Sequence, residues 1–110
     1  MANALLCLSA FVLLLVGLWP RNPRRWFYRN IYLHTPHWRR VRRRALENAE
    51  HTCQAWGCHW RYGSLDVHHL LYRLWQEQPN DLAVLCRTHH LRIHNGFDVP
   101  LKGGRKALGR

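Results

Sequence analysis

Residues 84–94 read VLCRTHHLRIH and place one cysteine and three histidines within nine positions. The apolar VLC at the start is typical of a buried strand. The polar residues that follow, up to Asn95-Gly96, are typical of a short helix with a glycine stop. Thiolates and imidazoles are the side chains with which proteins bind zinc. The stretch therefore predicts a strand that runs into a ligand-bearing helix, and it raises the question whether the ligands serve one metal site or two.

A second cysteine pair lies upstream, in the segment TCQAWGCHW at residues 52–60. Cys53 and Cys58 are separated by four residues, and Cys86 and His89 by two. Two such pairs from distant parts of the sequence predict a closed Cys₃His zinc site that adds folding energy to a small core. The chain has four cysteines, of which Cys7 lies in the apolar N-terminal run. The other three are an odd number, which favours a reduced zinc site over a disulfide framework. The alternative is that these cysteines are simply buried thiols.

Four histidines remain without a role in that site: His68, His69, His90 and His94. His90 and His94 are four residues apart and share one helix face, about a quarter-turn from the zinc pair. Residues 64–70, SLDVHHL, predict a strand, in which adjacent side chains point to opposite faces. His68 and His69 can have different roles for that reason, or the strand ends there and turns both side chains towards the cleft. Because imidazole both titrates near neutral pH and binds metals, base and ligand roles stay open.

Composition divides the chain into segments. DLAVLC at 81–86 predicts a second strand, and Thr35-Pro36 predicts the start of a helix that reaches about residue 50. The fold class expected is therefore a small α+β domain. The four segments are an apolar helix at 1–20, a basic aromatic linker at 21–34, the folded domain at 35–96, and a flexible basic tail with three glycines at 97–110.

The first segment has the composition of a membrane anchor. Residues 4–19 carry no charge, and counting from Met1 to Pro20 gives the roughly 20 apolar residues of a spanning helix. No positive residue precedes the run and no A-x-A-like site follows it, which disfavours a signal peptide. The arginines that follow would keep the folded domain in the cytoplasm of a single-pass protein. An amphipathic helix or a buried core helix is the alternative.

The net charge is +11, and fifteen of the 17 basic residues are arginine. Such a chain favours a polyanionic partner, because guanidinium groups hold phosphates with two hydrogen bonds and release counterions on binding. A solvated face or a membrane-surface patch would also explain the charge. We expect a nucleic-acid partner and no small-molecule cofactor.

The order C-x4-C, LDVHHL, EQPNDLAVLC and C-x2-HH-x3-H resembles the HNH endonuclease family. More narrowly, it is similar to the small zinc-containing members with a ββα-metal (His-Me finger) fold. The resemblance covers about residues 38–95 and is specific in order and spacing. It implies a ββα-metal domain stapled by structural zinc that hydrolyses DNA phosphodiester bonds. It also implies one catalytic divalent metal, Mg²⁺, Mn²⁺, Ni²⁺ or Zn²⁺.

The resemblance also assigns roles to residues. His69 matches the general base, and the catalytic metal ligands fall on His68, His90 and His94. The structural zinc ligands fall on Cys53, Cys58, Cys86 and His89, of which His89 stands where the family usually has cysteine. The family's central Asn falls on Asp81, with Asn80 one residue earlier, and Asp81 can pin the loop as an acceptor. Glu77 matches a residue that is frequent in this subgroup.

Phosphate contacts without base readout are expected from arginines around this site. They are Arg43, Arg44, Arg73, Arg87 and Arg92. Two other functions remain open: a non-catalytic zinc-binding nucleic-acid module, and a membrane-associated basic adaptor in which zinc is purely structural. The second histidine set separates them from a nuclease, because a binding module needs only the four zinc ligands.

Overall fold

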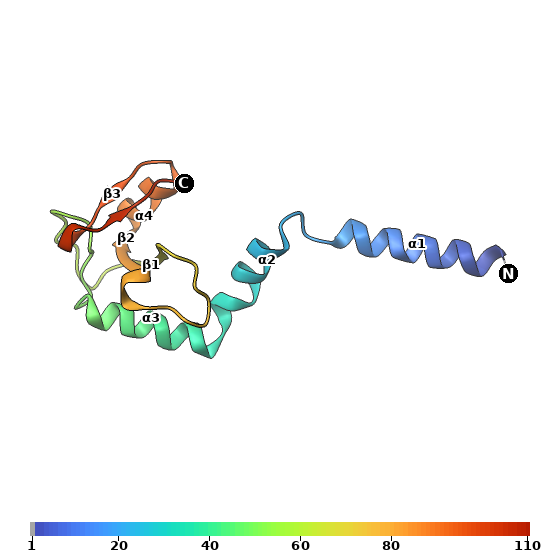
Figure 1. The fold of residues 1–110 in the computed structure, drawn as a ribbon, viewed down its shortest axis with the longest axis horizontal. Coiled ribbons are helices and arrows are strands. Elements are labelled where there is room, and N and C mark those ends of the chain that lie inside the picture. The colour runs from blue at the N-terminus through green and yellow to red at the C-terminus, as the bar shows by residue number, and fades with distance from the viewer. Residues whose placement is uncertain (1) are drawn as a thin grey trace. The chain divides into compact units, whose positions relative to one another are not determined.

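The computed structural model describes residues 2–110, which form a unit ending at Thr35 and a second unit, Pro36–Arg110. Over these residues the chain is a small α+β protein with four α-helices and two small sheets (Figure 1). The elements are α1 (Ala2–Leu18), α2 (Pro23–Asn30), η1 (Tyr32–His34), α3 (Pro36–Asn48), β1 (Leu65–His69), η2 (Pro79–Asp81), β2 (Leu82–Cys86), α4 (Arg87–His94), β3 (Val99–Pro100), η3 (Lys102–Gly104) and β4 (Lys106–Ala107).

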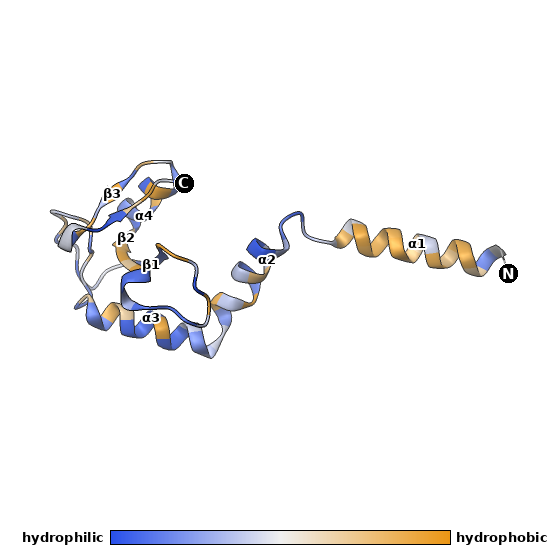
Figure 2. Cartoon of the chain, viewed as in Figure 1, coloured by the Kyte–Doolittle hydropathy of each residue, from blue (hydrophilic) through white to orange (hydrophobic). Residues whose placement is uncertain are grey.

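Helix α1 is apolar on all its faces (Figure 2). Its leucine, valine and phenylalanine side chains are at least half exposed. The helix ends at Leu18, two residues before Pro20, which disfavours helical backbone in the residue preceding it. At 17 residues α1 is about 25 Å long, against a hydrocarbon layer of about 30 Å. No single described helix meets the length and hydropathy of a membrane span, whereas Asn3–Leu18 and Pro23–His34, bent by 67°, meet them together.

The segment 21–34, expected as a linker, contains helix α2. The Asn22 side chain accepts a hydrogen bond from the Arg25 backbone N–H at 3.0 Å, and Pro23 occupies the first helical turn. Both features stabilise a helix start, so the basic aromatic composition did not prevent helix formation.

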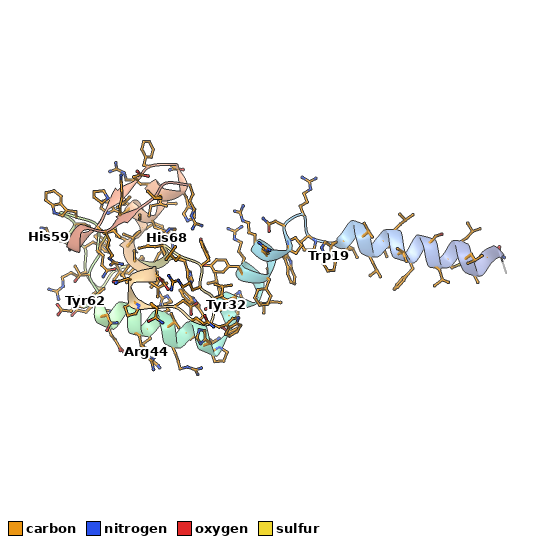
Figure 3. The ribbon with its side chains drawn as sticks, viewed as in Figure 1. Trp19, Tyr32, Arg44, His59, Tyr62 and His68 are labelled. Atoms are coloured by element: carbon orange, nitrogen blue, oxygen red, sulfur yellow. The ribbon has the colours of Figure 1, made fainter. Side chains whose placement is uncertain are left out.

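Helix α3 packs one face on the core and exposes its arginines. Trp38 is buried, and Ala45 and Leu46 pack against the hydrophobic core. The arginines at 39, 40 and 42–44 are exposed, and Arg44 projects from the outer side of the helix (Figure 3). This is the amphipathic helix that the sequence predicts from Pro36 to about residue 50.

Strands β1 and β2 pair antiparallel, with Leu65 opposite Cys86 and His69 opposite Leu82. Both α3 and α4 contact the pair, which lies between them in Figure 1. All five residues of β2 are buried, and α4 follows it directly. Helix α4 stops where Gly96 takes a positive φ of 87°, so the predicted strand–strand–helix order and the glycine stop are confirmed.

Residues 97–110, expected as a flexible tail, are folded onto the same core. Strands β3 and β4 pair antiparallel, and Val99, Leu101 and Ala107 are buried. Gly103 and Gly104 have φ values near +80° in the turn between the strands. The glycines were therefore a turn signal, and the few apolar residues around them supply the packing that holds the hairpin.

Candidate metal centres

Three thiols and one imidazole meet between the 52–60 segment and the start of α4. One ligand atom from each of Cys53, Cys58, Cys86 and His89 lies within 4.8 Å of the others. Nδ1 of His89 is 3.1 Å from Cys86 Sγ and 3.7 Å from Cys53 Sγ. Three sulfurs and one ring nitrogen suit tetrahedral zinc. The predicted set therefore comes together in space and can hold a metal ion such as zinc.

Burial affects the protonation of the ligand atoms in this cluster. Burial raises the pKa of the Cys53 thiol to about 11, and burial also lowers the pKa of His89. A thiolate at Cys53 therefore needs a positive charge beside it, which a divalent ion provides. The Lys102 ammonium donates hydrogen bonds to the backbone carbonyls of Cys53 and Cys58 at 2.9 and 2.7 Å. These bonds connect the β3–β4 hairpin to the segment 52–60, which carries both cysteines.

A second cluster consists of three histidines. His68 at the end of β1 meets His90 and His94 on α4, with one nitrogen of each within 4.8 Å of the others. The Nε2 atoms of His90 and His94 are 3.1 Å apart. His90 follows His89 directly, yet the two contribute to different clusters, because each helical residue turns the side-chain direction by about 100°. Converging imidazoles of this kind form a ligand set for transition metals.

Asp66 orients one ring of this cluster. Its Oδ2 lies 3.1 Å from His90 Nδ1, which leaves Nε2 directed at His94. A carboxylate behind a ligating imidazole fixes the ring and raises its basicity. Asp66 had no role in the sequence reasoning, although it precedes His68 by two residues and so shares a strand face with it.

His69 belongs to neither ligand cluster, although it follows His68 directly in β1. Its side chain is fully buried, and its ring stacks on Trp38 and Tyr72 with centroid distances of 4.8 and 5.1 Å. Burial, followed by the nearby Arg110 charge, lowers the pKa of His69 to about 4. The same two causes lower the pKa of His68 to about 4. Both rings are therefore neutral at physiological pH.

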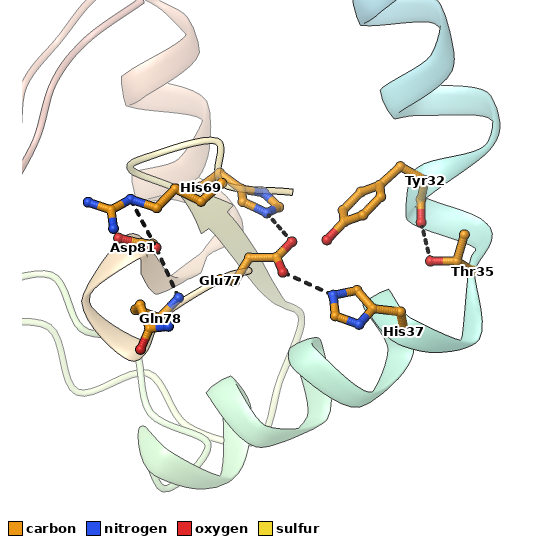
Figure 4. Close-up of polar contacts among 8 residues, drawn as sticks. Tyr32, Thr35, His37, His69, Glu77, Gln78 and Asp81 are labelled. Carbon is orange, nitrogen blue, oxygen red and sulfur yellow. Dashed lines mark hydrogen bonds and ion pairs between the residues drawn. The ribbon is translucent and has the colours of Figure 1, made fainter. Parts of the chain in front are cut away.

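Glu77 bridges two histidines (Figure 4). Its Oε1 is 3.4 Å from His69 Nε2, and its Oε2 is 3.0 Å from His37 Nε2. The Glu77 side chain is fully buried, and burial raises its pKa. The family resemblance gave Glu77 no role, and the sequence offers no local signal for one, because its two partners are eight and 40 residues away.

Asp81 anchors the loop that returns from β1 to β2. It is 3% exposed, and its carboxylate accepts a hydrogen bond from the Gln78 backbone N–H at 2.9 Å (Figure 4). Its backbone carbonyl accepts from the N–H of Leu70 at 2.7 Å. Asn80 is exposed, and its carbonyl accepts from Arg105 at 3.4 Å. The structure thus places Asp81 in the loop-pinning position and Asn80 beside it at the surface.

The arginines near the site differ in their contacts. Arg73 pairs with Asp81 at 3.7 Å and Arg87 with Asp66 at 3.5 Å, and both remain more than half exposed. Arg92 lies over the Phe97 ring. The exposed Arg43 and Arg44 belong to α3. None of these contacts removes the arginines from solvent, so they remain available to an anion.

Three further cations come from the C-terminal segment. An open pocket beside His68 is lined by Arg105, Lys106 and Arg110, among other residues. Arg110 lies 4.4 Å over the Tyr72 ring and donates to the backbone carbonyl of His69 at 3.5 Å. Sequence reasoning missed these residues because it treated the segment as a mobile tail.

Comparison with protein-family models found no match, and comparisons with curated proteins and with solved structures found no significant similarity. What the chain does is therefore inferred from the residues and geometry of its two clusters.

Proposed function

We propose that the unit Pro36–Arg110 is a metal-dependent endonuclease of the HNH type, with a ββα-metal fold, that hydrolyses phosphodiester bonds of DNA. The observation that carries this proposal is the pairing of the three-histidine cluster with a buried neutral histidine at the next position of β1. His68 belongs to the cluster and His69 points into a different environment. The Cys₃His cluster already offers four ligands to a structural metal, so the three-histidine cluster is not needed to stabilise the fold.

The proposed division of labour follows from these positions. His68, His90 and His94 would hold the catalytic ion, and their all-nitrogen set favours a transition metal over magnesium. When bound, a divalent ion supplies Lewis-acid stabilisation of the charge that develops on the scissile phosphate. His69 takes the proton of the attacking water, which its lowered pKa permits because the ring is neutral at working pH.

The remaining residues would bind the DNA backbone or hold the loop beside the site. Arg105, Lys106 and Arg110 line the pocket beside His68 and would contact backbone phosphates, which are read without base specificity. Asp81 holds the loop, and Asn80 lies at its surface. The rival function is a zinc-binding nucleic-acid module without catalysis. It explains the thiol cluster and the charge, but leaves the histidine cluster and its Asp66 partner without use.

A plasmid-nicking assay tests the proposal. Supercoiled DNA is incubated with the zinc-loaded chain and added Mg²⁺, Mn²⁺, Ni²⁺ or Zn²⁺. We expect cleavage with at least one metal, and a loss of roughly 10²- to 10⁴-fold in rate for His69→Ala. The control is His34→Ala, an exposed histidine outside this unit, which should cut at the wild-type rate.

Two results would contradict the proposal. A wild-type chain that binds DNA and stays inert with every metal points to the non-catalytic module. A His69→Ala variant that cuts as fast as wild type removes the base assignment.

We also propose that the N-terminal unit associates with a lipid bilayer and keeps the nuclease unit on the cytoplasmic side. The support is an α1 helix that exposes apolar side chains all round, followed by the basic α2 with its exposed Trp26. A helix that is apolar on every face suits hydrocarbon, whereas arginines and tryptophan suit the headgroup region.

A further inference from the structure

We infer that Glu77, held by His37, is a positioning residue that fixes the orientation and tautomer of His69, so that Nδ1 of His69 is the nitrogen that accepts the proton. This inference rests on the proposed nuclease function and assigns a role to a residue outside both metal clusters. It is carried by the contacts of three side chains, shown in Figure 4.

The plane of the His69 ring is set by stacking. Trp38 and Tyr72 lie against it with interplanar angles of 26° and 16°. Stacking restrains the tilt of an imidazole but distinguishes poorly between the two orientations related by a half-turn about Cβ–Cγ. A polar contact at one edge of the ring has to make that choice.

Glu77 supplies a polar contact of this kind. Its Oε1 faces His69 Nε2 at 3.4 Å, with both side chains fully buried. In such an environment an unmatched polar atom costs more than at the surface, so the orientation that keeps this contact is preferred. A half-turn of the ring would place a carbon atom against the carboxylate.

His37 holds the carboxylate in turn. Its Nε2 lies 3.0 Å from Glu77 Oε2, and its own ring packs on Trp75 with a centroid distance of 5.0 Å. Each carboxylate oxygen therefore faces one histidine, and rotation of the carboxylate would break both contacts. The order His37, Glu77, His69 joins the start of α3 to the end of β1 through the loop between the strands.

The chemical consequence concerns which nitrogen is basic. A neutral imidazole carries one proton, and a carboxylate accepts it only from an N–H. With Nε2–H donating to Glu77, the lone pair lies on Nδ1. Water then gives its proton to Nδ1, and its oxygen bonds to phosphorus while the bond from phosphorus to the leaving 3′ oxygen breaks. The 3′ oxygen takes up a proton from solvent, and Glu77 stabilises the imidazolium without taking a proton itself.

The tautomer can be measured directly. The full-length, zinc-loaded chain labelled with ¹⁵N-histidine is studied in detergent micelles by two-bond ¹⁵N–¹H correlation, with no second metal added. We expect His69 to be the Nε2–H tautomer. In Glu77→Gln, whose amide can donate as well as accept, the Nδ1–H tautomer should gain population. Glu47→Gln, an exposed carboxylate of α3, is the charge-matched control and should leave the tautomer unchanged.

Activity gives an independent readout. Glu77→Gln should lower kcat by roughly 10- to 100-fold with KM changed less than about 2-fold, as for other residues that orient a functional histidine. Combined with His69→Ala it should cause no further loss, because a residue that acts through His69 has nothing left to position. An unchanged zinc content and circular dichroism spectrum separate this role from a structural one.

The outcomes are distinguishable from those of the nuclease assay. A wild-type His69 in the Nδ1–H form overturns the inference without any variant being made. A folded Glu77→Gln chain in which the tautomer of His69 is unchanged overturns it as well. If the wild type shows the expected tautomer and cuts no DNA with any metal, the Glu77–His69 contact stands and the proposed function, with the catalytic use of that contact, is overturned.

Discussion

At the scale of single residues, adjacent histidines have separate surroundings. His68 faces the histidine cluster, and His69 lies among Trp38, Tyr72 and Glu77. The strand geometry that sends neighbouring side chains to opposite faces explains the split. In the proposed function, one short segment would therefore offer both a metal ligand and a base.

The buried His69 makes stability depend on pH. Its pKa is about 4 in the folded chain and about 6.5 in an unfolded one. Between these values the unfolded state binds more protons, so the free energy of unfolding falls as pH falls through this window. From pH 7.5 to 5.5 this residue should account for a loss of about 1.3 kcal/mol.

Urea unfolding of the zinc-loaded chain at the two pH values, followed by tryptophan fluorescence, measures this loss. His69→Gln should reduce the pH dependence by that amount, while His34→Ala should not change it. A His69→Gln chain with the wild-type pH dependence would show that this ring is protonated equally in both states.

At the scale of elements, α4 contributes side chains to two candidate ligand clusters from different faces. Cys86 at its N-cap and His89 face the thiols, whereas His90 and His94 face β1. The first site joins the 52–60 segment to the helix, so its loss affects folding. The second adds no comparable link, because β1 and α4 already pack through the core.

The two sites should therefore respond differently to substitution. Cys86→Ser should lose zinc and unfold the unit, since a structural zinc contributes about 10–16 kcal/mol, as much as the whole stability of a small domain. His90→Ala should remain folded with zinc bound and lose one metal per chain after loading with Ni²⁺. Metal analysis by mass spectrometry, with His59→Ala as the exposed control, checks both.

A chain that loses both metals in His90→Ala would show that the clusters do not act independently. A Cys86→Ser chain that stays folded without zinc would show that zinc at the Cys₃His cluster is not required for folding.

At the scale of the whole molecule, the net charge and the apolar N-terminal unit predict different partners. The excess of basic over acidic residues gives a net charge of +11, which attracts any polyanion, including an anionic membrane. Hydrocarbon insertion of α1 would add binding that salt does not screen. Resistance of membrane binding to salt therefore distinguishes a chain with α1 inserted in the bilayer from a chain held at the surface by charge alone.

Vesicle flotation separates the two contributions. The full-length chain should float with phosphatidylcholine vesicles that contain anionic phosphatidylglycerol and stay bound in 1 M NaCl, about the concentration at which screening reduces the Debye length to 3 Å. Val12→Arg in the middle of α1 should abolish the salt-resistant binding. Arg24→Gln is the control and should weaken only the salt-sensitive part. Complete release of the wild type by salt would contradict insertion.

Several features could be predicted from the sequence because they are local. Alternating and periodic apolar residues predicted β1, β2 and the amphipathic α3, and Gly96 predicted the end of α4. The cysteine and histidine spacing predicted the Cys₃His set, and the family resemblance assigned the second set, His68, His90 and His94. The residues of each set do meet in space. The family resemblance and its nuclease activity remain a prediction that the assays above address.

Contacts between distant residues had no such local signal. The bridge from His37 through Glu77 to His69, the Asp66 partner of His90, and the folding of Val99, Leu101 and Ala107 into the core each join segments far apart in the chain. Sequence by itself therefore determined which elements form and which side chains can bind metal, because propensity and spacing act over a few residues. Only the tertiary structure decided which groups orient these side chains, because the choice of partner depends on which surfaces pack together.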